Sequence, residues 1–432
     1  MIDARSLAVE ILEELDEGKK LSTFLINEKE NLVQAEDRPL IRNYIYGVLE
    51  NRSFLDSMIQ SISDRKLDQM DPYLLNLLRL AFYELHFLSK PSYAVVYEAV
   101  ELAKRRERRS ASFINGVLQN FLRKKEEILQ LDRKDLLSYL SIRYSHPRWI
   151  VDKMRKEFSL KKLEEILIKN NSPAPISLFI RPDRISRDQA FEVLKKDLLN
   201  VRKSKLSPYV LLADGGDITG HKLFQEGMMT IQSQPSLLVA QMAVEGFEDQ
   251  ALNILDLCAA PGSKALAMAV LAKKSQVLAN DLSLDKKMKI EENIERFQIS
   301  NMTTSIWDGR KDQKEWHQAF DVVLVDAPCS GLGLLRRKPD IRYLRKEEDI
   351  LSLAQLQKDI VKKAMAYVKK DGRLVYSTCT YGKEENEDIV STILETNSFE
   401  IESFQERKAW KFSPLVEDAD GFFMIRFRKK EQ

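Results

Sequence analysis

Short apolar runs recur through the second half of the chain, and helical stretches separate them. The runs are ALNILDL, SQVLANDL, MTTSIW, FDVVLVDA and GRLVYSTC, and the segments between them include KALAMAVLAK and KKMKIEENIERF. Apolar strands that alternate with amphipathic helices are typical of a parallel sheet with helices on both faces. The pattern therefore predicts a doubly wound α/β domain over residues 233–432, in which GFFMIRFRK is expected to add a late, antiparallel strand.

The N-terminal part of the chain has helical periodicity and almost no strand signal. Apolar residues recur at helical spacing in LAVEILEEL, RPLIRNYIYGVLENRSFLDSMI, LLNLLRLAFYELHFL, AVVYEAVELAKR and ASFINGVLQNFLRK. Asp71 followed by Pro72 marks the start of one helix, because aspartate caps a first turn and proline fits its first position. We expect an all-helical domain over residues 1–130 and a helical linker over residues 131–170.

The stretch between these two parts has mixed signals. Prolines flank the apolar run ISLFI, a loop and the amphipathic stretch ISRDQAFEVLKKD follow, and strand-like pieces recur at YVLLAD and GMMTIQS. This order predicts a strand, a helix and further short strands. We expect a small α/β unit over residues 171–232, which ends where PSLLVAQMAV begins a helix.

Composition excludes several classes of protein. Of the 432 residues, 44% are hydrophobic and 31% are charged, and no stretch is long and apolar enough for a membrane span. The segment MIDARSLAVEILEELDEG lacks the basic start and the cleavage site of a secretory signal, so we expect a cytoplasmic protein. The three cysteines are too far apart in sequence for a zinc cluster or a disulfide framework, and no other metal constellation is visible. We expect free thiols, no bound metal and a monomer.

The loops after the first predicted strands carry the residues expected at a cofactor site, because ligands of open α/β sheets bind beyond the carboxyl ends of the strands. In DLCAAPGSK, small residues let the backbone approach a ligand. Asp281 ends the next strand, where a carboxylate can hold ribose hydroxyls, and Asp308 lies where it could bind an adenine amino group. A dinucleotide site normally needs G-x-G-x-x-G, whereas this loop has only Gly262. S-adenosylmethionine is therefore the expected cofactor, although strand-end aspartates also serve as helix caps.

Two of the three cysteines follow neighbouring predicted strands. Cys329 lies in DAPCSGLG and Cys379 lies in YSTCTY, so both are expected at the ligand edge of the sheet. Facing thiols suit cytosine methylation: a thiolate that adds to carbon 6 makes carbon 5 nucleophilic toward a sulfonium methyl, and a second acid–base group assists departure of the thiol. Asp326 could hold the base and stabilise the protonated adduct. Packing residues and a redox pair are the alternatives, and the residues alone do not rank the two cysteines.

Six motifs resemble those of the RNA cytosine-C5 methyltransferases, in particular the bacterial enzymes of 16S ribosomal RNA. They are LDLCAAPGSKALAMA, ANDLS, WDGR, DAPCSGLGLLRRKPDIRY, YSTCTYGKEENE and, upstream, YSHPRWIV. DRPLIRNYIYGVLENRSFLD and INGVLQNFLR are similar to the helical domain of the antitermination factor NusB, and ISLFIRPD is similar to a small RNA-recognition-like unit. The resemblance covers nearly the whole chain. It implies a NusB-like domain, the small α/β unit and a Rossmann-like domain that methylates carbon 5 of one specific cytosine in unassembled or partly assembled 16S rRNA.

The resemblance also implies roles for individual residues. Cys379 would be the nucleophile, Cys329 would help to release the product, and Asp326 would lie between cofactor and base. The implied cofactor-binding residues are Cys258, Ala259, Ala260, Pro261, Gly262, Ser263, Lys264, Asp281, Asp308 and Asp326. Ser263 stands where the family commonly has a second glycine, and Asp183 in FIRPD stands where asparagine is common. Arg181 in the same loop is retained, which implies a contact with RNA.

Two basic clusters are candidates for RNA contact. Residues 104–125 hold eight Lys or Arg residues against one acid, Glu107, and RRKPDIRYLRK over residues 336–346 follows the expected catalytic loop. A solvated helix face is the alternative for the first cluster. The target cytosine is expected to be unpaired or flipped out, because a thiol cannot reach carbon 6 of a stacked base. The alternative functions are the same chemistry on transfer RNA and a non-catalytic RNA-binding factor of ribosome assembly.

Overall fold

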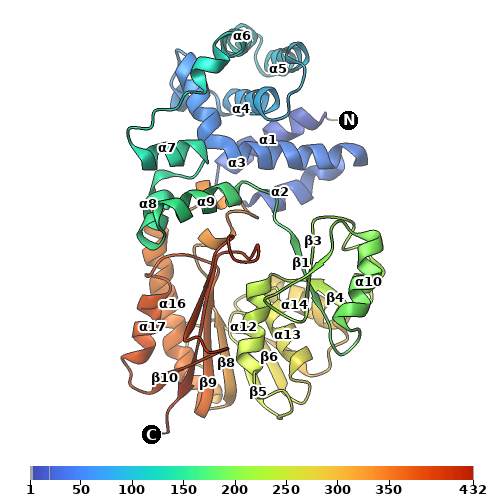
Figure 1. Ribbon diagram of the computed structural model, residues 1–432, viewed down its shortest axis with the longest axis vertical. Helices are drawn as coiled ribbons and strands as arrows, with labels where there is room; N and C mark the ends of the chain where they lie inside the picture. The colour runs from blue at the N-terminus through green and yellow to red at the C-terminus, as the bar shows by residue number, and fades with distance from the viewer. Residues whose placement is uncertain (1–2, 19, 432) are drawn as a thin grey trace. The chain divides into compact units, whose positions relative to one another are not determined.

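The computed structural model describes residues 3–18 and 20–431, and the chain divides into two compact units (Figure 1). The first contains Met1–Asn171 and Arg337–Arg345, and the second contains Ser172–Arg336 and Lys346–Gln432. The chain therefore passes between the units at three places. Within the described ranges, no helix has the length and apolar character needed to cross a membrane.

The first unit is entirely helical. Its helices are α1 (Ala4–Asp16), α2 (Ser22–Lys29), α3 (Arg38–Ile62), α4 (Pro72–His86), α5 (Ser92–Arg106), α6 (Ser110–Ile128), α7 (Leu136–Arg143), α8 (Arg148–Glu157), α9 (Leu160–Asn170) and α15 (Ile341–Leu344). The predicted start of α4 is confirmed, because Asp71 accepts a hydrogen bond from the Leu74 amide at 3.1 Å and Pro72 follows it. Helix α2 was not predicted, since its apolar residues do not gather on one face.

The second unit begins with a small sheet of four antiparallel strands in the order β2-β3-β1-β4. The strands are β1 (Ile176–Ile180), β2 (Arg202–Lys203), β3 (Val210–Ala213) and β4 (Met229–Ile231), and the helices are α10 (Arg187–Asp197) and α11 (Lys222–Gln225). Ser186 and Gln189 form a capping box that starts α10. Apolar residues of β1, β3 and α10 share one core, so the predicted small α/β unit is confirmed.

The rest of the second unit is an eight-stranded sheet in the order β10-β12-β9-β8-β5-β6-β7, with β11 paired to β12. The strands are β5 (Asn253–Asp256), β6 (Gln276–Asp281), β7 (Met302–Ile306), β8 (Phe320–Asp326), β9 (Val368–Thr378), β10 (Phe399–Glu402), β11 (Ala409–Phe412) and β12 (Phe422–Lys429). The helices are α12 (Gln234–Val244), α13 (Ser263–Leu271), α14 (Leu284–Phe297), α16 (Glu347–Tyr367) and α17 (Glu387–Leu394). Strands β5 to β9 are parallel, and β12 is antiparallel to β9, as the sequence predicted.

Both faces of the large sheet are buried, which explains why its strands read as continuous apolar runs. Val322 and Leu324 of β8 pack in the core with α12 and α13, whereas Val323 and Val325 pack in the core with α16 and α17. Figure 1 shows these helix pairs on opposite sides of the sheet. The predicted doubly wound architecture is thus confirmed, and the loops after the parallel strands meet at one edge.

Candidate active site

The loops after β8 and β9 bring two cysteines together. The two strands are parallel neighbours, so their carboxyl ends lie side by side. The Sγ atoms of Cys329 and Cys379 are 3.2 Å apart, and both residues are free thiols. The neighbouring Cys379 side chain and burial raise the pKa of Cys329 well above its ordinary value. Cys329 is therefore a protonated thiol at neutral pH.

A lysine and an aspartate form an ion pair beside the thiols. Asp326 ends β8, where its Oδ1 accepts a hydrogen bond from Ser377 Oγ at 2.7 Å and its Oδ2 accepts one from Lys264 Nζ at 2.6 Å. Burial alone would lower the pKa of Lys264, but the charge of Asp326, its hydrogen bond and a thiolate at Cys379 raise that pKa on balance. Lys264, predicted for the cofactor, thus directs its positive charge toward Asp326.

A buried carboxylate that sequence analysis missed joins the two cysteine loops. Glu385 accepts hydrogen bonds from Ser330 N at 2.8 Å, from Ser330 Oγ at 2.6 Å and from Gln357 Nε2 at 3.0 Å. Gln357 also donates to Pro328 O at 2.9 Å, and Tyr376 Oη donates to Glu385 O at 2.7 Å. Glu385 lies in the KEENE stretch, but nothing in the sequence distinguishes it from the neighbouring acids.

Two glycines allow the loop after β8 to pack tightly. Gly333 N donates to Cys379 O at 2.9 Å, and Gly421 N donates to Gly333 O at 2.9 Å. A Cβ atom on Gly333 would lie 1.9 Å from Gly421 O, a distance that no side chain can adopt. Residues that precede β12 therefore brace the loop that carries Cys329.

The predicted cofactor loop, Cys258 to Lys264, connects β5 to α13. Ala260 N donates to Asp281 Oδ2 at 2.9 Å, which fixes the loop against the end of β6. Gly262 has φ +99°, a left-handed conformation that favours glycine, and a Cβ atom there would lie 3.1 Å from Ile290. Ser263 is the first residue of α13 and lies outside the left-handed region, so the serine fits where the family commonly has glycine.

Three aspartates follow successive strands near this loop. Asp281 is buried, and its Oδ1 accepts hydrogen bonds from Leu282 N and from Lys286 Nζ at 2.7 and 2.8 Å. Asp256 is 1% exposed and no described side chain hydrogen-bonds to its carboxyl; burial, and then the charge of Asp326, raise its pKa to about 8. Asp308 is held by Arg310, whose hydrogen bonds lower the pKa of Asp308 to about 2. In the described part of the chain, no group of three or more His, Cys, Asp or Glu residues could hold a metal ion.

Arg181 does not have the role that the resemblance implied. Its side chain is 3% exposed, and it donates to Asp183 at 2.8 Å and to the backbone oxygens of Gly227 and Phe297. A buried guanidinium with these partners cannot reach RNA, so the predicted contact is wrong. Arg181 instead joins the small sheet to α14, and Asp183, where asparagine is common, is its ion-pair partner.

Two arginines of the basic cluster at residues 336–346 are not available to RNA, whereas Lys346 is exposed and the other cations are half-buried. Arg336 is 8% exposed and Arg342 is fully buried. Arg336 donates to Ser172 O at 3.1 Å and to Asp418 at 3.0 Å. The prediction that an RNA backbone passes over these two arginines is wrong, because both are used inside the protein. By contrast, the cations at the end of α5 and in the turn before α6 are exposed.

Comparison with known proteins identifies relatives over the whole chain. The family described as 16S rRNA methyltransferase RsmB/F matches residues 242–428, the NusB family matches residues 2–123, and the ferredoxin-like domain of RsmF/B-like methyltransferases matches residues 146–218. Probable ribosomal RNA small subunit methyltransferase B of Bacillus subtilis (strain 168) is 33% identical, with 99% of this chain and 98% of that protein covered. Ribosomal RNA small subunit methyltransferase B of Photorhabdus laumondii is 32% identical, with 96% of each covered. The crystal structure of PH0851 has the same fold, with a TM-score of 0.80, 22% identity and 99% of each chain covered.

Proposed function

Because the chain belongs to the RsmB/F family of 16S rRNA methyltransferases, we propose that it transfers a methyl group from S-adenosylmethionine to carbon 5 of one specific cytosine in 16S rRNA. The observation that carries the proposal is the pair of thiols, Cys329 and Cys379, 3.2 Å apart at the ends of two parallel strands. Asp326 lies at the end of the first of these strands. The expected substrate is unassembled or partly assembled 16S rRNA, in which the target base is unpaired or can be flipped out.

The residues around the cofactor loop fit S-adenosylmethionine. Asp256 offers a buried carboxyl that no described side chain engages, which suits an ammonium group of the cofactor. The close-packed turn at Gly262 lets the backbone approach a nucleoside, and Asp281 ends β6 where a ribose would be held. Asp308 is proposed as the adenine contact. When bound, the cofactor supplies a methyl group on a positively charged sulfur, which is the electrophile.

The chain supplies the nucleophile of the proposed reaction. The thiolate of Cys379 forms a bond to carbon 6 of cytosine, and the electron pair of the 5,6 double bond becomes available at carbon 5, which takes the methyl group. Cys329 stays protonated because its pKa is raised, and Cys379 is the nucleophile that the family resemblance implies. The ammonium of Lys264 stabilises this thiolate electrostatically.

Release of the product reverses the first bond. A base takes the proton from carbon 5, the 5,6 double bond forms again, and the bond between carbon 6 and sulfur breaks, so that Cys379 leaves as a thiolate. Cys329 is the acid–base group that assists this departure, since it lies beside the leaving sulfur. Asp326 holds the base, and Glu385 keeps the two cysteine loops together.

The exposed cations of residues 104–125 are the proposed phosphate contacts. Lys104, Arg105, Arg106, Arg108 and Arg109 are all exposed, on the last turn of α5 and the turn before α6. Such clusters neutralise phosphates and release counter-ions, so they supply affinity without sequence recognition.

A covalent-trapping experiment tests the proposal. The Cys329→Ala protein is incubated with S-adenosylmethionine and a 16S rRNA transcript, and a denaturing gel is examined for a slow band that contains RNA. We expect the band to appear and to disappear when Cys379→Ala is added, since the first variant attacks but cannot release. A missing band, with methylation by the wild type, would contradict the roles of the two cysteines. No methylation by the wild type would contradict the rRNA substrate and favour transfer RNA or a non-catalytic RNA-binding role.

A further inference from the structure

A pocket of about 480 Å³ is formed entirely by residues of the helical unit, and none of them is proposed above for methyl transfer. It is lined by His86 at the end of α4, by residues 129–131 after α6, and by Arg133, Tyr139 and Arg143. We call it the arginine pocket. Its volume falls within the range of about 300–1,000 Å³ that is typical of sites for small ligands. The pocket is therefore large enough for one nucleotide.

The charge of the arginine pocket is positive. Arg133 and Arg143 are exposed, and none of the described residues that line the pocket is acidic. Burial, and then the positive charges of Lys125 and Arg143, lower the pKa of His86. Because cations act on this histidine from two helices, the pocket attracts an anionic group such as a phosphate.

The two arginines of the pocket are not used to stabilise the protein. Among the described residues, no carboxylate pairs with Arg133 or Arg143, and neither guanidinium donates to a backbone oxygen. Lys125 differs, because its Nζ donates to Leu85 O at 3.5 Å and so satisfies a carbonyl near the end of α4. The charges of the two arginines therefore remain available to a ligand.

Arg133 is held against an aromatic ring. Its Nη2 donates to Tyr139 Oη at 3.1 Å, and its guanidinium lies 4.7 Å from the centre of the Tyr139 ring. An arginine over a ring presents a flat, positively charged face. Unpaired bases of RNA stack on arginine planes and on aromatic rings. This side of the pocket therefore suits a base.

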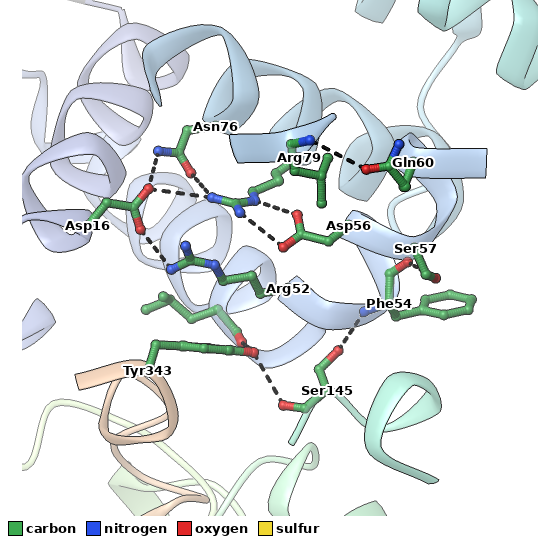
Figure 2. A network of polar contacts seen from close by, with 12 residues as sticks. Asp16, Arg52, Phe54, Asp56, Ser57, Gln60, Asn76, Arg79, Ser145 and Tyr343 are labelled. Atoms are coloured by element: carbon green, nitrogen blue, oxygen red, sulfur yellow. Dashed lines mark hydrogen bonds and ion pairs between the residues drawn. The ribbon is translucent and has the colours of Figure 1, made fainter. Parts of the chain in front are cut away.

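Arg143 and His86 share a buried ring as their support. The Arg143 guanidinium lies 5.3 Å from the centre of the Phe54 ring, and the ring centres of His86 and Phe54 are 5.7 Å apart. Phe54 is 1% exposed, and its amide donates to Ser145 Oγ at 3.0 Å (Figure 2). This side of the pocket has a fixed floor and an arginine whose charge suits a phosphate.

The helices that supply this floor are joined by ion pairs, which Figure 2 shows. Arg79 of α4 donates two hydrogen bonds to Asp56 of α3, at 2.7 and 2.9 Å, and pairs with Asp16 of α1 at 3.4 Å. Asp56 lies two residues after Phe54 on α3, and His86 ends α4. The network therefore fixes α3 against α4, and the floor of the pocket is formed before a ligand binds.

We propose that the arginine pocket binds one unpaired nucleotide of the RNA substrate, with a phosphate on Arg143 and the base stacked beside Arg133 and Tyr139. The exposed cations of residues 104–109 contact phosphates only, whereas this pocket also holds a base. The helical unit thus selects an unpaired segment in addition to supplying general affinity. The choice of RNA as the ligand rests on the proposed function.

The test uses the full-length protein without S-adenosylmethionine, so methyl transfer plays no part. A 16S rRNA transcript is cross-linked to the protein by ultraviolet light, the linked peptides are identified by mass spectrometry, and Kd is measured by filter binding at several salt concentrations. Arg133→Gln with Arg143→Gln removes the charge, Tyr139→Leu removes the ring, and Tyr139→Phe keeps the ring. The matched control, Lys161→Gln with Lys162→Gln, removes the same charge from exposed positions of α9.

In the wild type we expect cross-links within residues 129–143. In the double arginine variant these cross-links should fall by about 5-fold or more, Kd should rise about 10-fold, and the slope of log K against log salt should decrease in magnitude by about 1. Tyr139→Leu should raise Kd about 5-fold with an unchanged slope, because stacking is lost and charge is kept. Tyr139→Phe and the lysine control should stay within about 2-fold of the wild type.

Three results would overturn the proposal: no binding of the transcript, bound transcript that cross-links only outside residues 129–143, or equal Kd values for the double arginine variant and the lysine control. Calorimetry with cytidine monophosphate identifies the other source of a nucleotide. If this free nucleotide binds and RNA cross-links only elsewhere, the pocket is a small-molecule site and the proposal is wrong. If the wild type cross-links as expected but does not methylate the transcript in the presence of S-adenosylmethionine, the proposed function fails and the arginine pocket stands.

Discussion

The two basic clusters of this chain look alike in sequence, but only the second contains buried arginines. The cluster at residues 104–125 places its cations on the surface of the helical unit, whereas the cluster at residues 336–346 buries Arg336 and Arg342. In the first, the cations gather at a helix end and the adjoining turn, which suits phosphates. In the second, Ile341 and Tyr343 lie on either side of Arg342 and pack in the protein. Because these neighbours are packed inside, the Arg342 guanidinium is buried as well.

The comparison teaches that charge density alone does not identify an RNA surface. A buried arginine needs carbonyl or carboxylate partners, and those partners come from residues far away in sequence. For Arg342 they come from α3, from the turn before α8 and from the end of α9. The interleaved apolar residues are the local sign that a basic cluster is structural.

The largest expected effect is the loss of stability in Arg342→Met. The substitution leaves backbone carbonyls of a buried socket without their donor, so we expect the helical unit to lose about 2–4 kcal/mol. Hydrogen exchange of α3 and α8 measures the loss. If the free energy of unfolding changes by less than about 0.5 kcal/mol, as is typical for an exposed residue, the two clusters do not differ in the way described.

Arg336→Met should have a smaller effect, of about 2 kcal/mol, and in the other unit. Arg336 forms hydrogen bonds with Ser172, Pro173 and Asp418. Hydrogen exchange of backbone amides should therefore become faster near these residues, while the amides of α3 exchange as slowly as in the wild type. This result would sharpen the comparison, because it would show that a single basic motif stabilises two units separately. Equal loosening of α3 in the variant would count against this division.

A lower pH should destabilise the helical unit around the buried Arg342. Burial, and then the charge of Arg342, hold the pKa of His146 well below its ordinary value. In the unfolded chain the His146 side chain takes up a proton below about pH 6.5, whereas in the folded protein it stays neutral. The unfolded state therefore binds more protons below this pH, and the free energy of unfolding falls by up to about 1.4 kcal/mol per pH unit as the pH drops. Above that pH this contribution is constant. Stability of the helical unit measured between pH 7.5 and 5 should show the slope, and His146→Gln should reduce it; His86, whose pKa burial also lowers, keeps the rest.

The smallest effect on stability is expected for Arg108→Ala with Arg109→Ala in the exposed cluster. Their free energy of unfolding should stay within about 0.5 kcal/mol of wild type, because both side chains are in water. RNA affinity should fall, and the slope of log K against log salt should decrease in magnitude by about 2, one for each lost phosphate contact. The control is Lys161→Ala with Lys162→Ala, exposed cations of α9. An equal loss of affinity in this control would contradict a localised RNA surface.

Much of the fold follows from local signals. The run FDVVLVDA predicted β8, and Asp71 with Pro72 predicted the start of α4, because strand burial on two faces and helix capping depend on adjacent residues. Strands β10 and β11 were missed: FEIE and AWKF are short and lie in the antiparallel extension, where pairing with β12 decides the conformation. Intrinsic strand propensity therefore does not predict β10 and β11.

The candidate site was only partly predictable for the same reason. Strand ends placed Cys329, Cys379 and Asp326 at one edge of the sheet, whereas the separate roles predicted for the two cysteines came from resemblance. Glu385 was missed because its partners, Ser330 after β8 and Gln357 in α16, lie far from it in sequence. A residue whose contacts come from distant parts of the sequence cannot be identified from the sequence pattern around it.

The close contact of Gly333 with Gly421 has a consequence for the order in which the protein is made. The loop that carries Cys329 can form its hydrogen bond with Gly421 only when Gly421 has been synthesised, and the helical unit likewise is incomplete until residues 337–345 have been made. Since translation proceeds from the N-terminus, a nascent chain that stops short of residue 421 has both thiols but lacks the assembled site. The contact between Gly333 and Gly421 can therefore form only when synthesis of the chain is nearly finished.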